Sequence, residues 1–140
     1  TRRVEEAAFL LSPEMETADV AYEQSLEEGL QARADAEQIK RALINLMKNA
    51  IQAMPTGGQL RASTHTEDGQ VVIHIGDDGP GIPATVRQHL FEPFFTTRQK
   101  GSGLGLAIVK YIAEKHQGHV TITSGIDGAG VGFTLQLPAA

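Results

Sequence analysis

The stretch from Ala36 to Met54 constrains the fold most, because its apolar residues recur with the period of an α-helix. The apolar stripe consists of Ile39, Leu43, Leu46, Ala50 and Met54. Charged residues, Glu37, Arg41 and Lys48, lie on the opposite side. Asp35 is placed to cap this helix, and Gln38 would complete a capping box. A helix with one apolar stripe must cover another layer, so we expect a layered domain.

Alternating apolar residues predict the sheet that this helix covers. Leu60 to Thr66 and Val71 to Asp77 alternate and are joined at Asp68-Gly69, which predicts a β-hairpin. Two further strands are expected, at His119 to Ser124 and at Val131 to Leu137.

The N-terminal part carries weaker patterns. Val4 to Met15 suits a short amphipathic helix, with Pro13 in conflict with its last turn. Val20 to Leu26 and Leu30 to Ala34 each alternate, so both are predicted as short strands.

The remaining elements complete one domain. Pro83 to Leu90 is expected to be a short helix, and Phe91 to Gly101 a loop without period. Leu104 to His116 is predicted to be a helix that ends at Gly118. With 140 residues, 41% of them hydrophobic, the chain has the size of a single domain spanning 1–140. The expected fold class is α/β, a two-layer sandwich of helices on a mixed, mainly antiparallel sheet.

Composition excludes several kinds of function. The chain has no cysteine, which rules out disulfides and thiolate chemistry. Its net charge of −5 argues against a general nucleic-acid binder. The apolar runs are far shorter than a membrane span and the first residues do not resemble a signal peptide, so we expect a soluble, cytoplasmic, monomeric piece with no membrane contact of its own. The membrane topology of a longer parent stays open.

Asn45, Asn49 and Gln52 share one face of the predicted 36–54 helix, along the border of its apolar stripe. Asparagine is a mediocre helix former, so two of them at this border suggest a task for their amide oxygens. Mg²⁺ takes oxygen ligands and keeps waters and substrate phosphates, so one amide oxygen would be a suitable protein ligand. The alternative is that both amides only satisfy nearby backbone groups.

Asp77 has the parity of the core residues Val71, Ile73 and Ile75, so its carboxylate is expected to point inward. A carboxylate there needs hydrogen-bond donors, and the glycines at 79 and 81 let another molecule approach closely. An adenine amino group is a suitable donor. The alternative is an aspartate that caps its own turn while Asp78 is merely solvated.

Residues 101–106, Gly-Ser-Gly-Leu-Gly-Leu, form a glycine-rich loop that runs into a helix, where free N–H groups and the helix dipole favour phosphate. The pattern is neither a dinucleotide fingerprint nor a P-loop. Arg98 and Lys100 could add positive charge, or could be exposed loop cations. The phenylalanines at 91, 94 and 95 suggest a loop that folds back as a lid, or a small satellite core. The five histidines show no metal-ligand or triad spacing.

Taken in order, these motifs resemble the GHKL ATPase/kinase superfamily, specifically the catalytic domain of two-component sensor histidine kinases. Residues 45–50 look like its N box, 77–83 like its G1 box, 91–97 like its F box, 101–106 like its G2 box and 128–133 like a G3 turn. The resemblance covers about 35–138, and residues 1–34 match loosely. It departs at Val131, where the family often has threonine.

The resemblance implies the Bergerat fold, ATP and Mg²⁺ as cofactors, and catalytic positions at Asn45 and Asn49, with Asn49 as the Mg²⁺ ligand. Asp77 would receive the adenine amino group. The nucleotide-binding positions that it implies are Asn49, Gln52, Asp77, Gly79, Gly81, Ile82, Phe95, Thr96, Thr97, Arg98, Lys100, Gly101, Ser102, Gly103, Leu104 and Gly105.

Asn45 selects among branches of the superfamily. In the gyrase-like and Hsp90-like members that this chain resembles, the matching position holds a glutamate that activates water for hydrolysis. An asparagine amide cannot act as such a general base. That favours transfer of the γ-phosphoryl group to a histidine on a separate dimerisation and phosphoacceptor domain, in the same parent chain or in trans, with a response regulator as an indirect partner. The alternatives are an anti-sigma-factor-type serine kinase and a nucleotide-binding module without catalysis.

Overall fold

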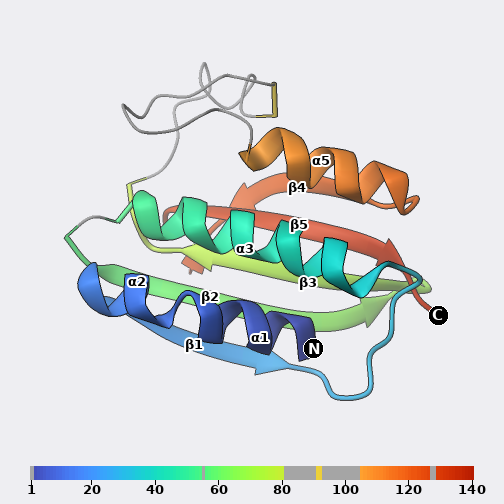
Figure 1. Cartoon of the computed structure of the whole chain (residues 1–140), viewed down its shortest axis with the longest axis horizontal. Helices are drawn as coiled ribbons and strands as arrows, with labels where there is room; N and C mark the ends of the chain where they lie inside the picture. The colour runs from blue at the N-terminus through green and yellow to red at the C-terminus, as the bar shows by residue number, and fades with distance from the viewer. Residues whose placement is uncertain (1, 55, 81–90, 93–104, 127–128) are drawn as a thin grey trace.

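The chain folds into one five-stranded sheet covered on one face by helices (Figure 1). The computed structural model describes residues 2–54, 56–80, 91–92, 105–126 and 129–140. The sheet order is β1-β2-β3-β5-β4, in which β1 is parallel to β2 and all other neighbours are antiparallel. Its strands are β1 (Val20–Leu26), β2 (Gly58–Glu67), β3 (Gln70–Asp77), β4 (His119–Ser124) and β5 (Val131–Pro138). The predicted two-layer sandwich on a mixed, mainly antiparallel sheet is confirmed.

The helical layer lies in front of the sheet in Figure 1, with α3 packed between α1 and α5. The described helices are α1 (Arg2–Leu10), α2 (Ser12–Thr17), α3 (Ala36–Gln52) and α5 (Gly105–Lys115). None of these helices is long and apolar enough to cross a membrane.

The core lies between the two layers and is built from the predicted periodicities. The stripe of α3 is buried, and so are the alternating positions of β3 and β5. The largest fully buried side chains are Leu43, Leu46, Met47, Leu60, Ile75, Leu135, Leu137, Val4 and Val109. Since each such side chain contributes about 1.5–3 kcal/mol when removed from water, this interface is the main source of stability.

The predicted hairpin is present, with β2 and β3 joined at Asp68 and Gly69. Both residues have positive φ, 51° and 76°, as the mirror-image turns of tight hairpins require. The hairpin sets the register that places Asp77 opposite Leu60, on the face toward the helices.

Two N-terminal predictions need correction. The single helix predicted from Val4 to Met15 is two helices that break at Leu11, and Pro13 lies in the first turn of α2, where proline's missing N–H costs nothing. The strand predicted from Leu30 to Ala34 is absent. Only Ala32 makes a bridge, to Ala139, and the alternation instead reflects side chains that pack against the core along a connecting segment.

The predicted capping box is half present. Asp35 Oδ1 accepts from the N–H groups of Glu37 and Gln38, at 2.9 and 3.2 Å. The reciprocal bond is replaced, because the Asp35 N–H donates to His116 Nε2 at 3.1 Å. His116 thereby ties the start of α3 to the end of α5.

The end of α5 also differs in detail from the prediction. The left-handed residue is Gln117, with φ 62°, and the Gly118 N–H donates to Ala113 O at 2.8 Å. Gly118 serves a different purpose: a β-carbon there would collide with the Gln136 carbonyl of β5. Glycine at 118 therefore lets the chain cross close to the sheet.

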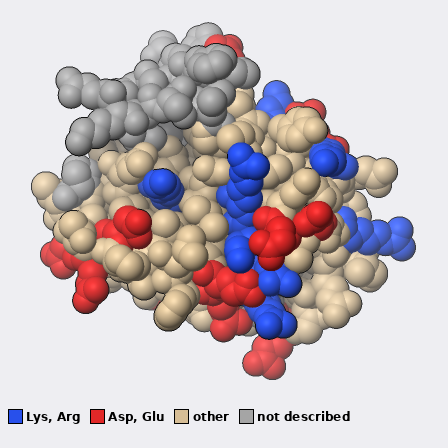
Figure 2. Space-filling model, in the orientation of Figure 1, with Lys and Arg blue, Asp and Glu red and all other residues tan. Residues whose placement is uncertain are grey.

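Acidic and basic side chains are interspersed on the helical face, and neither sign covers it (Figure 2). Part of this pattern is a set of ion pairs in which Glu6 of α1 contacts Arg3 at 2.6 Å and Lys40 of α3 at 3.6 Å. The Arg3 guanidinium holds the pKa of the Glu6 carboxyl below its ordinary value. The paired side chains are half-buried, and the Lys40 contact links α1 to α3.

Candidate functional site

Asp77 ends β3 with its carboxylate turned into the protein, as its parity predicts. Only 4% of the residue is exposed. Its Oδ1 accepts from two backbone N–H groups, that of Gly79 at 2.9 Å and that of Val131 at 3.2 Å. Within the described part of the chain both donors reach the same oxygen, so Oδ2 remains for a further donor.

Burial raises the pKa of the Asp77 carboxyl above its ordinary value, and neighbouring Asp78 adds to the rise. The N–H groups of Gly79 and Val131 act in the opposite direction and offset part of it. A buried carboxyl group whose ionisation is made less favourable by its surroundings is typical of a functional site.

Two glycines pack closely against Asp77. Gly130 has φ 65°, and a β-carbon on it would collide with the Asp77 carbonyl and Oδ1. Gly125 approaches as closely, because a β-carbon there would collide with the same carbonyl. The segments that flank β4 and β5 are thus packed directly on the Asp77 backbone.

Asn45 on α3 faces the start of α5. Its Nδ2 donates to the Arg41 carbonyl one turn back, at 3.1 Å. A β-carbon at Gly105 would lie 3.5 Å from Asn45 Oδ1. The amide is therefore oriented with its donor end engaged by the helix and its oxygen toward the first residue of α5.

The residues just after α3 meet the end of β3. A β-carbon at Gly79 would lie 3.0 Å from Met54 Cγ and 3.2 Å from Asp77 Oδ1. The C-terminal end of α3 therefore leads to the strand-end carboxylate, while Asn45 on the same helix faces the first residue of α5.

The other predicted α3 residues lie on the same side of the helix. Asn49 is half-buried one turn beyond Asn45, and Gln52 is exposed in the last turn. No group of three or more histidine, cysteine or acidic side chains able to hold a metal occurs among the described residues. A cation here would be held by amide oxygens and by the phosphates of a nucleotide, a donor set that fits Mg²⁺.

Comparison with known families identifies the domain. Residues 34–140 match the family described as "Histidine kinase-, DNA gyrase B-, and HSP90-like ATPase". The chain belongs to this family. It is therefore an ATP-binding domain, and the resemblance drawn from its sequence motifs is confirmed.

Its curated relatives include kinases of greater length. The chain is 39% identical over 137 residues to "Signal transduction histidine-protein kinase AtoS" of Escherichia coli, covering 96% of this chain and 22% of AtoS. It is 34% identical to "Sporulation kinase C" of Bacillus subtilis, covering 96% of this chain and 32% of that kinase. The chain thus spans between a fifth and a third of these two relatives.

Solved structures of histidine kinases share the whole fold. The catalytic domain of histidine kinase ThkA superposes with a TM-score of 0.86 at 30% identity, covering 98% of this chain and 92% of that one. Full-length ShkA, solved with AMPPNP, gives a TM-score of 0.85 at 26% identity and covers 99% of this chain and 29% of that one. Since the matches span nearly the entire chain, α1, α2 and β1 belong to the shared fold.

Much of the predicted nucleotide site lies outside the described residues. This applies to Gly81, Ile82, Phe95, Thr96, Thr97, Arg98, Lys100, Gly101, Ser102, Gly103 and Leu104, and to the helix predicted from Pro83 to Leu90. Of the predicted lid, Phe91 and Glu92 are described. The Phe91 ring packs edge-on against Phe133 of β5, with the ring centres 6.1 Å apart, so Phe91 joins the core.

Sequence reasoning missed three contributors to the Asp77 environment. Val131 acts through its N–H, so the absence of a threonine hydroxyl does not affect this contact. Gly125 and Gly130 act by lacking a β-carbon. The signals that pointed to this region were the run of glycines between β4 and β5 and the resemblance of residues 128–133 to a G3 turn. Asp78 is not merely solvated, as one alternative had it, because its Oδ1 accepts from the Gln59 N–H at 2.8 Å and fastens the end of β3 to β2.

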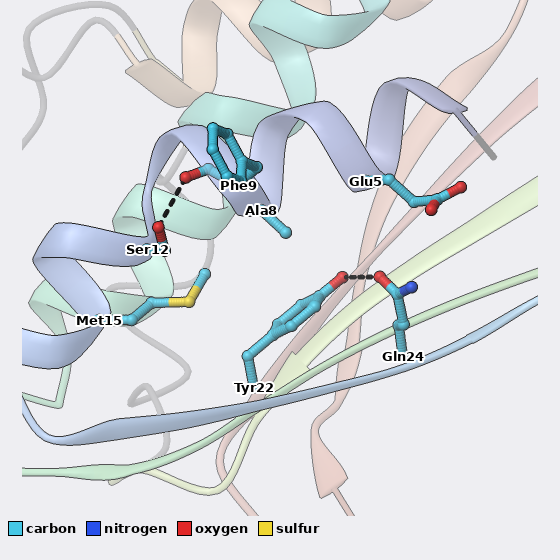
Figure 3. A pocket seen from close by; sticks show the side chains of 7 residues that line it. All are labelled: Glu5, Ala8, Phe9, Ser12, Met15, Tyr22 and Gln24. Atoms are coloured by element: carbon cyan, nitrogen blue, oxygen red, sulfur yellow. Dashed lines mark hydrogen bonds between the residues drawn. The ribbon is translucent and has the colours of Figure 1, made fainter.

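A separate groove of about 430 Å³ opens between α1, α2 and the edge strand β1 (Figure 3). The Tyr22 hydroxyl donates to Gln24 Oε1 at 2.9 Å, and burial, with a smaller effect of Glu5, raises the pKa of Tyr22 to about 12. Since β2 separates β1 from β3, this groove is distinct from the Asp77 site.

Proposed function

We propose that this domain binds Mg-ATP and donates its γ-phosphoryl group to a histidine on a separate phosphoacceptor domain of a two-component sensor kinase. The observation that carries the proposal is the buried Asp77, with both backbone donors on one oxygen. Its second oxygen suits the amino group of adenine, since a carboxylate accepts and cannot donate. The similarity to histidine kinases supports a histidine as the acceptor of the phosphoryl group.

In this proposal each side of the site has its own task. Asp77 reads the base, and Gly79 and Gly81 let it approach. Asn49 supplies an amide oxygen to Mg²⁺, which neutralises phosphate charge when it is bound. Asn45 and Gln52 lie beside it on α3. The segment from Phe95 to Gly105 holds the phosphates, with backbone N–H groups at the start of α5 and with Arg98 and Lys100.

The chemistry is a displacement at phosphorus. A histidine nitrogen of the acceptor domain forms a P–N bond to the γ-phosphorus as the P–O bond to the β-phosphate breaks, and ADP leaves. Asn45 cannot accept the proton of a water molecule, which disfavours hydrolysis. The domain's own contribution is therefore to hold the triphosphate in position for an external nucleophile.

Labelling with γ-labelled ATP tests the proposal. This domain alone should neither label itself nor hydrolyse ATP appreciably. With the helical phosphoacceptor domain of its parent kinase added, label should appear on a histidine of that domain, labile to acid and stable to base. Acid-stable label on serine would favour the anti-sigma-type kinase. Binding without transfer would favour a non-catalytic module, and rapid turnover by the domain alone would contradict the role of Asn45.

A further inference from the structure

The outer face of the sheet, opposite the helices, carries a pair of glycines behind Asp77. Gly76 of β3 and Gly132 of β5 lie opposite each other in register. The half-buried His74 ring fills the space that side chains would take. A β-carbon at Gly76 would lie 2.8 Å from His74 Cε1, and one at Gly132 would lie 2.5 Å from His74 Nε2. The two glycines thus form a seat for the imidazole ring.

From this seat His74 reaches the end of β4. Its Nε2 lies 3.2 Å from Thr123 Oγ1 and 3.3 Å from the Ser124 carbonyl oxygen. A carbonyl oxygen can only accept, so Nε2 carries the proton in that contact. The ring therefore ties β3 to the point where the chain leaves β4.

The neighbours in sequence of Ser124 and Gly132 contact Asp77. Gly125, next after Ser124, packs against the Asp77 carbonyl. Val131, next before Gly132, donates its N–H to Asp77 Oδ1. His74 thus contacts both segments that pack on Asp77, the first through a hydrogen bond to Ser124 and the second by covering Gly132.

We propose that His74 is a positioning residue of the nucleotide site, which holds Ser124–Gly125 and Val131–Gly132 so that Asp77 presents its second oxygen to the base. This rests on the proposed function, because the ligand of Asp77 is the adenine of ATP. His74 itself lies on the opposite face of the sheet from Asp77 and touches no nucleotide.

The sheet offers a matched control. His65 lies on β2 on the same outer face, and its ring contacts Glu67 Oε2 at 3.4 Å. His65→Ala removes the same side chain without touching the flanks of Asp77. His74→Gln keeps an N–H donor at a similar reach and is the conservative rescue.

The first measurement needs no nucleotide. Amide hydrogen exchange at Val131, followed by NMR, should be faster in His74→Ala than in wild type and in His65→Ala. His74→Gln should restore slow exchange. This arm remains informative if the domain fails to bind ATP, so it separates the positioning of Val131 from the proposed function.

The second measurement is the dissociation constant for ATP and for GTP with Mg²⁺. His74→Ala should weaken ATP binding about threefold to tenfold, as expected for a misaligned hydrogen bond, and should leave GTP binding unchanged. His74→Gln should recover most of the ATP affinity.

Three results would overturn the proposal. One is a His74→Ala domain that loses stability but keeps the Val131 exchange rate and the ratio of the two dissociation constants. Another is an equal loss of ATP and GTP affinity. The third is a His74→Gln domain that matches His74→Ala in both measurements. If His74→Ala does not fold, His74→Gln, compared with His65→Gln, decides by the same readouts.

Discussion

The two sides of the candidate site are built in different ways. At the end of β3 the groups that hold Asp77 are backbone N–H groups and glycines, contributed by segments far apart in the chain. On α3 the groups are amide side chains one turn apart, and Asn45 is oriented by its own helix. The strand end is thus assembled by the tertiary fold, and the helix side by local sequence.

This difference predicts how each side responds to substitution. The amide side chains of α3 lie outside its buried stripe, so their loss should affect chemistry more than stability. At the strand end Gly125 and Gly130 leave no spare space beside the Asp77 carbonyl, and Gly130 leaves none beside Oδ1, so adding a side chain at either glycine should disturb stability and base recognition together.

The largest expected effect is on the helix side. Asn49→Ala should reduce labelling of the phosphoacceptor histidine at least about a hundredfold, because it removes the proposed Mg²⁺ ligand, while the thermal midpoint stays within a few degrees. Lys48→Ala, an exposed neighbour on α3, is the control. Labelling that survives in Asn49→Ala would remove this residue from the metal site.

The next effect tests the crowding at the strand end. Gly130→Ala should destabilise the domain by about 3 kcal/mol and impair ATP binding, since the new β-carbon meets the Asp77 carboxylate and the backbone has φ 65°. Gly29→Ala is the matched control, with φ 76° and no atom within 4 Å of a β-carbon. It should cost about 1 kcal/mol, for backbone strain alone. If urea unfolding showed the same loss of unfolding free energy for Gly130→Ala as for Gly29→Ala, the close packing of Gly130 on Asp77 would be contradicted.

A smaller effect separates two adjacent carboxylates. Asp78→Ala removes the acceptor for the Gln59 N–H and should lower the free energy of unfolding by about 1 kcal/mol. The preference for ATP over GTP should not change, because Asp78 Oδ1 is directed to β2. A variant that loses this preference would make Asp78 part of base recognition.

The smallest effect concerns stability against pH without nucleotide. The folded pKa of Asp77 is raised, so its ionisation opposes folding. The penalty is present above the folded pKa and disappears as pH falls toward the unfolded pKa. Asp77→Asn keeps an acceptor for both N–H groups and should therefore be slightly more stable than wild type at neutral pH, with the advantage vanishing in acid. A variant that is less stable at neutral pH would contradict the assigned cause of the shift.

The sequence predicted those features that depend on period and parity. The α3 stripe, the hairpin and the inward Asp77 follow from the alternation of side chains, which the backbone geometry enforces. The same rule misled at Leu30 to Ala34, because a connecting segment against the core can also bury alternate residues.

What could not be predicted depends on contacts between distant segments. The Asp35 N–H donates its hydrogen bond to His116, which lies 81 positions later, and not to the nearby Gln38. Val131 contributes an N–H that every residue except proline carries, so its identity held no signal. The tight approach of Gly125 to Asp77 likewise becomes visible only when the strands are in register.

The base preference of Asp77→Asn tests the account most directly. Since both backbone donors engage Oδ1, the asparagine amide must place its NH₂ where Oδ2 stood, turning an acceptor into a donor. Titration calorimetry with Mg²⁺ should show that the wild-type domain binds ATP at least about tenfold more tightly than GTP, and that this preference shrinks by about tenfold or reverses in the variant, because guanine presents a carbonyl where adenine has its amino group. A wild-type domain that binds both nucleotides equally, or a variant that keeps the original preference, would contradict the assignment of Asp77 as the residue that reads adenine.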